Sequence, residues 1–151
     1  MGFSLIGLLI TCVILLPNLL MILLPPKNMP EKVGSAGALM TMIERAGQVS
    51  CFLLPVFSQG FIESADTNLW FYIAVVCVAA YYGLWFRYAL KRDVKLLFAP
   101  FLLIPIPMAV FPVLAFAFIA VWIQSGWLLA AALVLAVGHF ANSFAAYKSI
   151  A

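Results

Sequence analysis

Five long apolar stretches run through this chain, and its basic residues occupy alternate connections between them. The apolar stretches cover about residues 3–24, 38–58, 69–90, 96–122 and 126–147. A bilayer core about 30 Å thick needs roughly 20 helical residues to cross it. In a membrane only helices or closed barrels satisfy the backbone polar groups. These apolar runs lack the period-two alternation of barrel strands, so each is expected to form a helix. The sequence predicts an all-α, polytopic membrane protein in which residues 1–151 form one bundle of five transmembrane helices.

The distribution of charge predicts how this bundle is oriented. Arg45 lies early in the second stretch and Arg87 in the last turn of the third, and the other basic residues follow the first, third or fifth stretch. The remaining connections carry only Glu63 and Asp66, or no charge. Because positively charged connections stay in the cytoplasm, we expect the N-terminus outside and the C-terminus inside. The chain is therefore expected in the cell membrane as a multi-pass protein.

Composition excludes an ordinary soluble domain. Only 9% of the residues are charged and 67% are hydrophobic, whereas soluble domains contain about 25% charged residues. The net charge of +3 is explained by orientation, so we expect no nucleic-acid partner. The partner expected at the inner leaflet is the bilayer itself, with its anionic headgroups. The candidate headgroup contacts are Arg87, Lys91, Arg92 and Lys95.

Metal and cofactor chemistry find little support in the sequence. Cys12, Cys51 and Cys77 are isolated and form no C-x-x-C pair, so we expect three buried thiols that pack as small apolar groups. His139 is the only histidine and has no second imidazole with which to build a zinc site. Nucleophile-elbow, phosphate-loop and dinucleotide motifs are also missing. We therefore predict neither a metal nor a cofactor.

Polar residues inside the apolar stretches are the candidates for a functional site. Glu44 and Arg45 lie about six residues into the second stretch, and Gln48 follows Glu44 by one helical turn. A charged residue costs about 2.5–3.5 kcal/mol at the centre of a membrane helix, and less near the interface. Such residues mark binding sites, ion pathways and proton relays.

Three further polar residues share this depth. Asn18 lies six residues from the inner end of the first stretch, and His139 and Asn142 lie on one helical face in the inner half of the fifth. Helix direction alternates between spans, so sequence spacing does not force this agreement. We predict a polar cluster that opens toward the cytoplasm and binds a substrate or ion. Its candidate residues are Glu44, Arg45, Gln48, Asn18, His139 and Asn142.

A second interpretation of these residues stays open. The second stretch also spans the membrane if it uses about residues 46–62, which places Glu44 and Arg45 at the interface. Asn18, Gln48 and Asn142 then serve interhelical hydrogen bonds worth roughly 0.6 kcal/mol each. His139 would be a packed, hydrogen-bonded imidazole.

The fourth stretch is rich in proline. Pro100, Pro105, Pro107 and Pro112 all lie within residues 96–122. Each interior proline removes a helical hydrogen bond and frees a carbonyl one turn back. We therefore expect this helix to be kinked or broken near Pro105 and Pro107. Such a kink either shapes the bundle or exposes carbonyl groups to a solute.

Three functions are compatible with the pattern. The leading hypothesis is a non-enzymatic protein that binds or translocates a small solute or ion, as a homo-oligomer or with a partner membrane subunit. The second is a membrane-embedded enzyme acting on a lipid or isoprenoid, with Glu44 or His139 as general base. The third is an assembly or regulatory subunit of a membrane complex. Sequence alone names no substrate.

Overall fold

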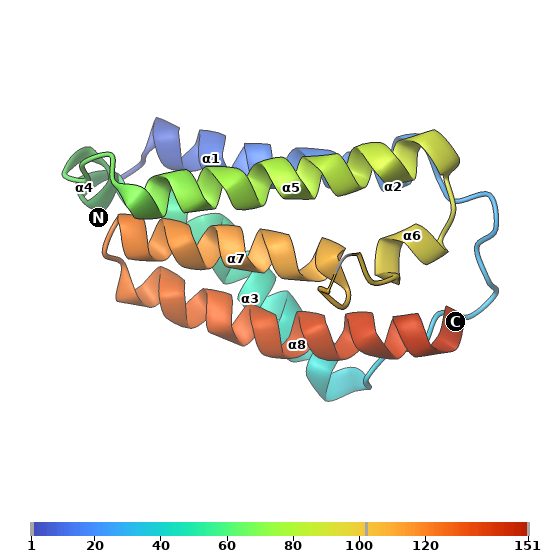
Figure 1. Ribbon diagram of the computed structural model, residues 1–151. Helices are drawn as coiled ribbons and strands as arrows, with labels where there is room; N and C mark the ends of the chain where they lie inside the picture. Colours follow the sequence, from blue (N-terminus) through green and yellow to red (C-terminus); the bar gives the residue numbers. More distant parts are fainter. Residues whose placement is uncertain (1, 102, 151) are drawn as a thin grey trace.

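The chain forms an elongated helical bundle with its two termini at opposite ends (Figure 1). The computed structural model describes residues 2–101 and 103–150, and all regular secondary structure within these ranges is helical. The helices are α1 (Leu5–Leu15), the 3-10 helix η1 (Leu16–Leu19), α2 (Leu20–Leu23), α3 (Ala38–Val56), α4 (Gln59–Glu63), α5 (Leu69–Lys91), α6 (Lys95–Phe98), α7 (Pro107–Trp122) and α8 (Gly126–Ile150).

Three of these helical segments are long and apolar enough to cross a membrane, which indicates a membrane protein. They are the run from α1 to α2 (Leu5–Leu23), α5 and α8. The apolar helix α7 is shorter, at 16 residues. The 19-residue helix α3, which contains Glu44 and Arg45, is not among the three.

A proline inside the first segment creates a contact with α5. Pro17 lies in η1 and has no N–H, so the carbonyl of Val13, four residues earlier, lacks its helical donor. The Tyr82 hydroxyl donates to this carbonyl at 2.7 Å. The hydrogen bond lost within one helix is thus replaced by a bond from its neighbour.

The fourth apolar stretch forms two helices. The helix α6 ends at Phe98 and α7 begins at Pro107, and the described residues between them are not helical. Pro107 occupies the first turn of α7, where its missing N–H removes no helical bond. Ile106, just before it, has a left-handed backbone with φ of 44°. This conformation ends any helix that approaches from the N-terminal side.

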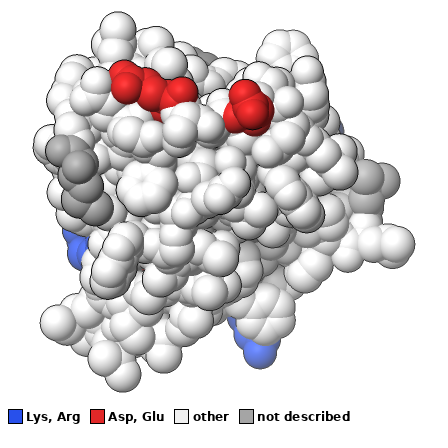
Figure 2. Space-filling model, turned by 90° about the vertical axis from the view of Figure 1, so that its left-hand side faces the viewer, with Lys and Arg blue, Asp and Glu red and all other residues white. Residues whose placement is uncertain are grey.

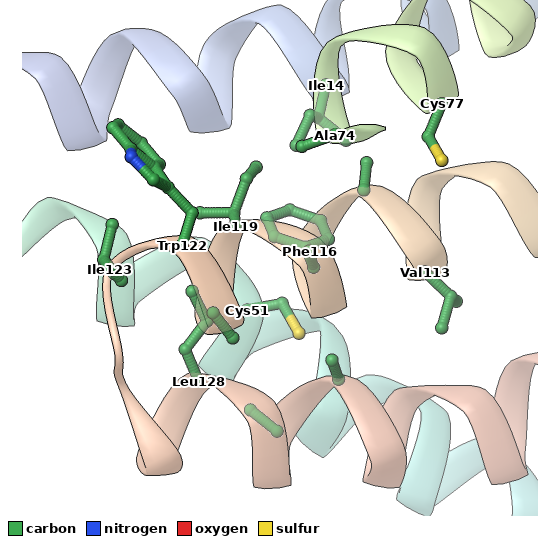
Figure 3. Close-up of a cluster of buried hydrophobic side chains, with 14 of the residues drawn as sticks. Ile14, Cys51, Ala74, Cys77, Val113, Phe116, Ile119, Trp122, Ile123 and Leu128 are labelled. Carbon is green, nitrogen blue, oxygen red and sulfur yellow. The ribbon is translucent and has the colours of Figure 1, made fainter. Parts of the chain in front are cut away.

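The core lies along the centre of the bundle in two clusters of buried side chains. The larger joins α1, α3, α5, α7 and α8, and Figure 3 shows Phe116, Ile119 and Leu128 among its members. The smaller contains Tyr81, Trp85 and other residues of α5 with residues of α6 and α7. Cys51 and Cys77 are buried in the larger cluster, as the sequence predicts, whereas Cys12 is exposed.

Two glycines bring α3 and α8 into close contact. A Cβ atom on Gly47 would lie 2.5 Å from the Cα of Leu135, and one on Gly138 would collide with the backbone of Glu44. Neither position accepts a side chain without separating the helices. Gly138 is the central residue of α8, so the close contact fixes Glu44 level with the middle of that helix.

The two ends of the bundle differ in charge. Glu63 in α4 and Asp66 just after it are exposed at one end, and Figure 2 shows acidic side chains gathered along one edge of that face. At the opposite end lie the C-terminal turn of α5, the short helix α6 and the C-terminal turn of α8 (Figure 1). This end carries Arg92, Lys95 and Lys148. These are called the acidic end and the basic end below.

Candidate functional site

A carboxylate, an imidazole and an amide meet where α3 crosses α8. One oxygen of Glu44, Oε1, lies 2.5 Å from Nδ1 of His139. The other oxygen, Oε2, accepts a hydrogen bond of 2.5 Å from Nδ2 of Asn142. All three side chains are partly buried. The spacing of His139 and Asn142 on one face of α8 lets both reach the same carboxylate.

The hydrogen bonds around Asn142 assign the proton positions. Its Oδ1 accepts from the backbone N–H of Ala36 at 2.9 Å, so its amide nitrogen must face Glu44. With Oε2 already accepting from this amide, the Glu44 carboxylate accepts from His139 through Oε1. When Glu44 is ionised its Oε1 is only an acceptor, and the tautomer of His139 that fits this contact is the one with the proton on Nδ1. Its Nε2 has no hydrogen-bond partner in residues 2–101 and 103–150.

His139 also lines a cavity of about 160 Å³ inside the bundle. Asn18, Gln48 and Tyr81 contribute the other polar groups of its wall. The Tyr81 hydroxyl donates to Oδ1 of Asn18 at 2.6 Å. The apolar part of the wall consists of Ile14, Leu15, Phe52, Pro112, Val113, Phe116 and Leu135. Because a water molecule occupies about 30 Å³ of liquid, the cavity has room for a few waters or one small solute.

The structure brings five of the six predicted site residues together. His139 and Asn142 are each hydrogen-bonded to Glu44, and Asn18 and Gln48 share the cavity with His139. Arg45, the sixth, is exposed on the outer side of α3 and does not line the cavity.

Two apolar grooves follow the seam between α1 and α5. The first, of about 300 Å³, lies toward the acidic end and includes Ile10, Ile14 and Phe71 in its wall. The second, of about 420 Å³, lies toward the basic end and is lined by residues of η1, α2 and α5. Ile14 is common to the first groove and the cavity. Hydrogen bonds from Tyr81 and Tyr82 join the helices between the two grooves.

The connection between α2 and α3 is bound to the basic end at several points. The side chain of Asn28 donates to Oδ1 of Asp93 at 2.9 Å and accepts from the backbone of Val94 at 2.9 Å. Further along, the backbone N–H of Gly34 donates to the Ser149 hydroxyl at 2.8 Å. The same connection carries Ala36, whose N–H binds Asn142, so the site and the basic end are linked through this segment.

Two of the four predicted headgroup contacts interact with the protein itself. The guanidinium of Arg92 donates two hydrogen bonds to the carbonyl of Pro25, at 3.1 and 2.8 Å. The guanidinium carbon of Arg87 lies 4.8 Å from the centre of the Phe101 ring. Lys91 and Lys95 are exposed at the basic end.

Sequence reasoning missed several residues that build the site. Tyr81 has no signal in the sequence, because it is one aromatic residue among many in an apolar helix. Gly47 and Gly138 are ordinary glycines in apolar stretches, and only their contacts reveal their importance. The hydroxyl of Thr41 lies 3.5 Å from the amide nitrogen of Asn142. Thr41 is one helical turn before Glu44, so helical spacing from Glu44 could have identified it as a member of the polar cluster.

The described ranges contain no group of three His, Cys, Asp or Glu side chains close enough to hold a metal ion. Comparison with known proteins found no matching family model, no matching curated protein and no matching solved structure for this chain.

Proposed function

We propose that this chain is a five-span protein of the cell membrane that binds, and carries across, a small polar solute or cation. In this arrangement α3 and the interrupted pair α6–α7 complete the five spans, and the basic end faces the cytoplasm. The observation that carries the function is the Glu44–His139 pair of 2.5 Å beside a cavity lined by Asn18 and Gln48. Paired ionisable groups inside a membrane bundle typically serve substrate or proton pathways.

The chemistry of the cavity restricts what it binds. Asn18 and Gln48 offer amide groups, and Nε2 of His139 offers an acceptor. The carboxylate of Glu44 is the nearest formal charge and lies behind the imidazole. A solute that donates hydrogen bonds or carries a positive charge suits this wall better than an anion. Proton transfer to His139 at Nε2 would convert the acceptor to a donor and thereby alter solute affinity.

The single histidine allows a direct test of this site. Protein labelled with ¹⁵N only in His139 gives two ring-nitrogen signals by solid-state NMR in lipid vesicles. We expect a protonated Nδ1 and an unprotonated Nε2 at neutral pH, and a change in the Nε2 shift when a bound solute is added. The panel of solutes is ammonium, methylammonium, urea, glycerol and acetate. A protonated Nε2 with a bare Nδ1 would contradict the assigned hydrogen bonds.

Uptake into the same vesicles tests transport. Solutes that shift Nε2 should enter vesicles containing the native protein, and Glu44→Gln should abolish this uptake. Glu31→Gln makes the same chemical change at an exposed residue of the α2–α3 connection and serves as the matched control. Equal uptake by the native protein and the Glu44→Gln variant would disprove the transport function.

A second candidate function is supported by the groove near the acidic end. This groove shares Ile14 with the cavity and is almost entirely apolar. A lipid or isoprenoid lying in it would place one end beside His139, where the Glu44–His139 pair is arranged as a general base. The two functions differ in their products, because only the enzyme converts a lipid incubated with the reconstituted protein into a new compound.

A further inference from the structure

The outer side of α3 carries a positive charge that the bundle does not neutralise. Arg45 is exposed, and within the described part of the chain it takes part in no ion pair or side-chain hydrogen bond. The neighbouring carboxylate, Glu44, points about 100° away around α3 and accepts from Asn142 through one oxygen, while its other oxygen contacts His139. Arg45 therefore faces whatever surrounds the bundle.

The close contact between α3 and α8 gives the depth of this charge. In α3, Arg45 lies between Glu44, which touches Gly138, and Gly47, which touches Leu135. Its backbone is thus level with the middle of α8. Lys148, near the basic end, lies ten residues beyond Gly138, which is about 15 Å along the helix. This placement rests on the proposed function, in which α3 crosses the membrane. A cation held at such a depth is stabilised by a counter-charge close to it.

A groove of about 460 Å³ begins at Ala46, the residue after Arg45, and runs between α3 and α8 toward the acidic end. Its wall includes the small residues Ala46, Ser50, Ala130 and Ala131, together with Val49, Leu53, Leu54, Trp127 and Val134. Small side chains let the backbone of another helix approach closely, which is how helices associate in membranes. Val49 lies one helical turn from Arg45, so a helix in the groove would pass close to the position of this residue on α3.

The charge determines which helix fits this groove. The chain has five acidic residues, namely Glu31, Glu44, Glu63, Asp66 and Asp93. Glu44 alone lies at this depth, and its two oxygens are already bonded. A second copy of this chain would bring another Arg45 and no free carboxylate. We propose that Arg45 and the α3–α8 groove dock a transmembrane helix of a different membrane protein, one with an Asp or Glu near its centre.

Photo-crosslinking in the native membrane tests this docking site. Benzoylphenylalanine replaces Val49, which is 55% exposed in the groove. The control probe replaces Val76, which is 65% exposed on α5. Each probe is introduced into the otherwise native chain and into the Arg45→Met and Arg45→Lys variants. Cross-linked products are identified by mass spectrometry, and circular dichroism of each purified variant verifies that it is folded.

The expected product at Val49 is an adduct with one transmembrane helix that bears a central carboxylate. Its yield should fall about tenfold in Arg45→Met, which corresponds to 1.4 kcal/mol of lost affinity, and should persist in Arg45→Lys. The Val76 probe should not give this product. The docking site is refuted by adducts with lipid only, by adducts with a second copy only, or by a protein adduct whose yield is independent of Arg45.

Discussion

Gly138 lies so close to Glu44 that no methyl group fits between α8 and α3 at this point. This contact has a direct chemical consequence, because the next residue of α8 is His139. The two helices must approach at this level for Nδ1 and the carboxylate to come within 2.5 Å of each other. The glycine is thus a positioning residue for the pair, although it has no side chain.

Replacing Gly138 with Ala should destabilise the protein and separate the pair. The added Cβ collides with backbone atoms of Glu44, which cannot rotate away. Overpacking of this kind costs roughly 1–3 kcal/mol. The free energy of unfolding in mixed detergent measures this cost. Gly83→Ala is the matched control, because a Cβ at Gly83 would meet nothing within 4 Å and this glycine also lies inside a long helix, α5.

The control variant should be as stable as the native protein or more so. Alanine in an open helical position reduces the entropy of the unfolded chain by an amount worth about 0.4–1 kcal/mol. Equal losses of stability in Gly138→Ala and Gly83→Ala would show that the α3–α8 contact is not the cause.

Asn142→Ala should release the end of the α2–α3 connection. The Ala36 N–H then loses its acceptor, and its hydrogen exchange should become faster. Ser149→Ala should accelerate exchange at Gly34 instead, because the Ser149 hydroxyl is the acceptor there. Hydrogen-exchange NMR distinguishes the two amides. An identical exchange pattern in both variants would mean that the connection opens as one unit and that the two bonds are not independent.

The Tyr82 hydroxyl should contribute more to the free energy of unfolding in the native chain than in a Pro17→Ala variant. In the native chain it donates to the carbonyl of Val13, whose ordinary helical donor is missing at Pro17. Alanine at position 17 restores the helical N–H, so the carbonyl no longer depends on Tyr82. We expect Tyr82→Phe to cost roughly 0.6 kcal/mol in the native background, and less beside Pro17→Ala. A double-mutant cycle of unfolding free energies measures the difference. Additive effects would refute the coupling.

Asp93 should contribute a pH-dependent part of the stability of the basic end. The hydrogen bond from Asn28 is the main reason that the pKa of Asp93 lies below its ordinary value of 3.8, and the backbone N–H of Lys95 lowers this pKa further. A carboxyl group whose pKa is lowered on folding stabilises the protein above its unfolded pKa. This stabilisation is lost as the pH falls through the folded pKa.

Asn28→Ala removes the larger cause, so the pKa of Asp93 should rise toward its ordinary value and the loss of stability in acid should become smaller. The ¹³C shift of the Asp93 carboxyl reports its pKa, and unfolding between about pH 2 and 6 reports the stability. If the pKa of Asp93 is the same in the variant, the hydrogen bond from Asn28 does not stabilise the Asp93 carboxylate when the protein is in solution.

The helical class and much of the polar cluster follow from the sequence for clear physical reasons. Hydrophobic runs of this length require helices, and helical periodicity alone puts His139 and Asn142 on one face. Glu44 and His139 lie at a similar depth on separate helices, and this agreement predicts that their side chains are in contact. Their convergence in the structure agrees with this pattern. The contact between Glu44 and Gly138 places Glu44 level with the middle of α8, and the membrane register of the second apolar stretch stays a prediction.

Other features depend on contacts that no local pattern encodes. Arg45 follows Glu44 directly, so sequence grouped the two, yet successive residues on a helix point about 100° apart and only one enters the cluster. The prolines of the fourth stretch predict a break, but the extent of the gap between Phe98 and Pro107 depends on the packing around it. The role of Tyr81 depends on which helix lies opposite.

The seam between α1 and α5 has a consequence for access to the cavity. Grooves occupy both of its ends. Tyr81 and Tyr82 bridge it at mid-height through their bonds to Asn18 and Val13, and Tyr88 bridges it near the basic end through a bond of 2.7 Å to the carbonyl of Leu24. By contrast, α3 and α8 are in backbone contact and cannot separate without losing packing along their crossing. The bundle therefore has one side in backbone contact and one side bridged by the hydroxyl groups of Tyr81, Tyr82 and Tyr88. Opening the second side breaks hydrogen bonds, whereas opening the first side separates two closely packed backbones.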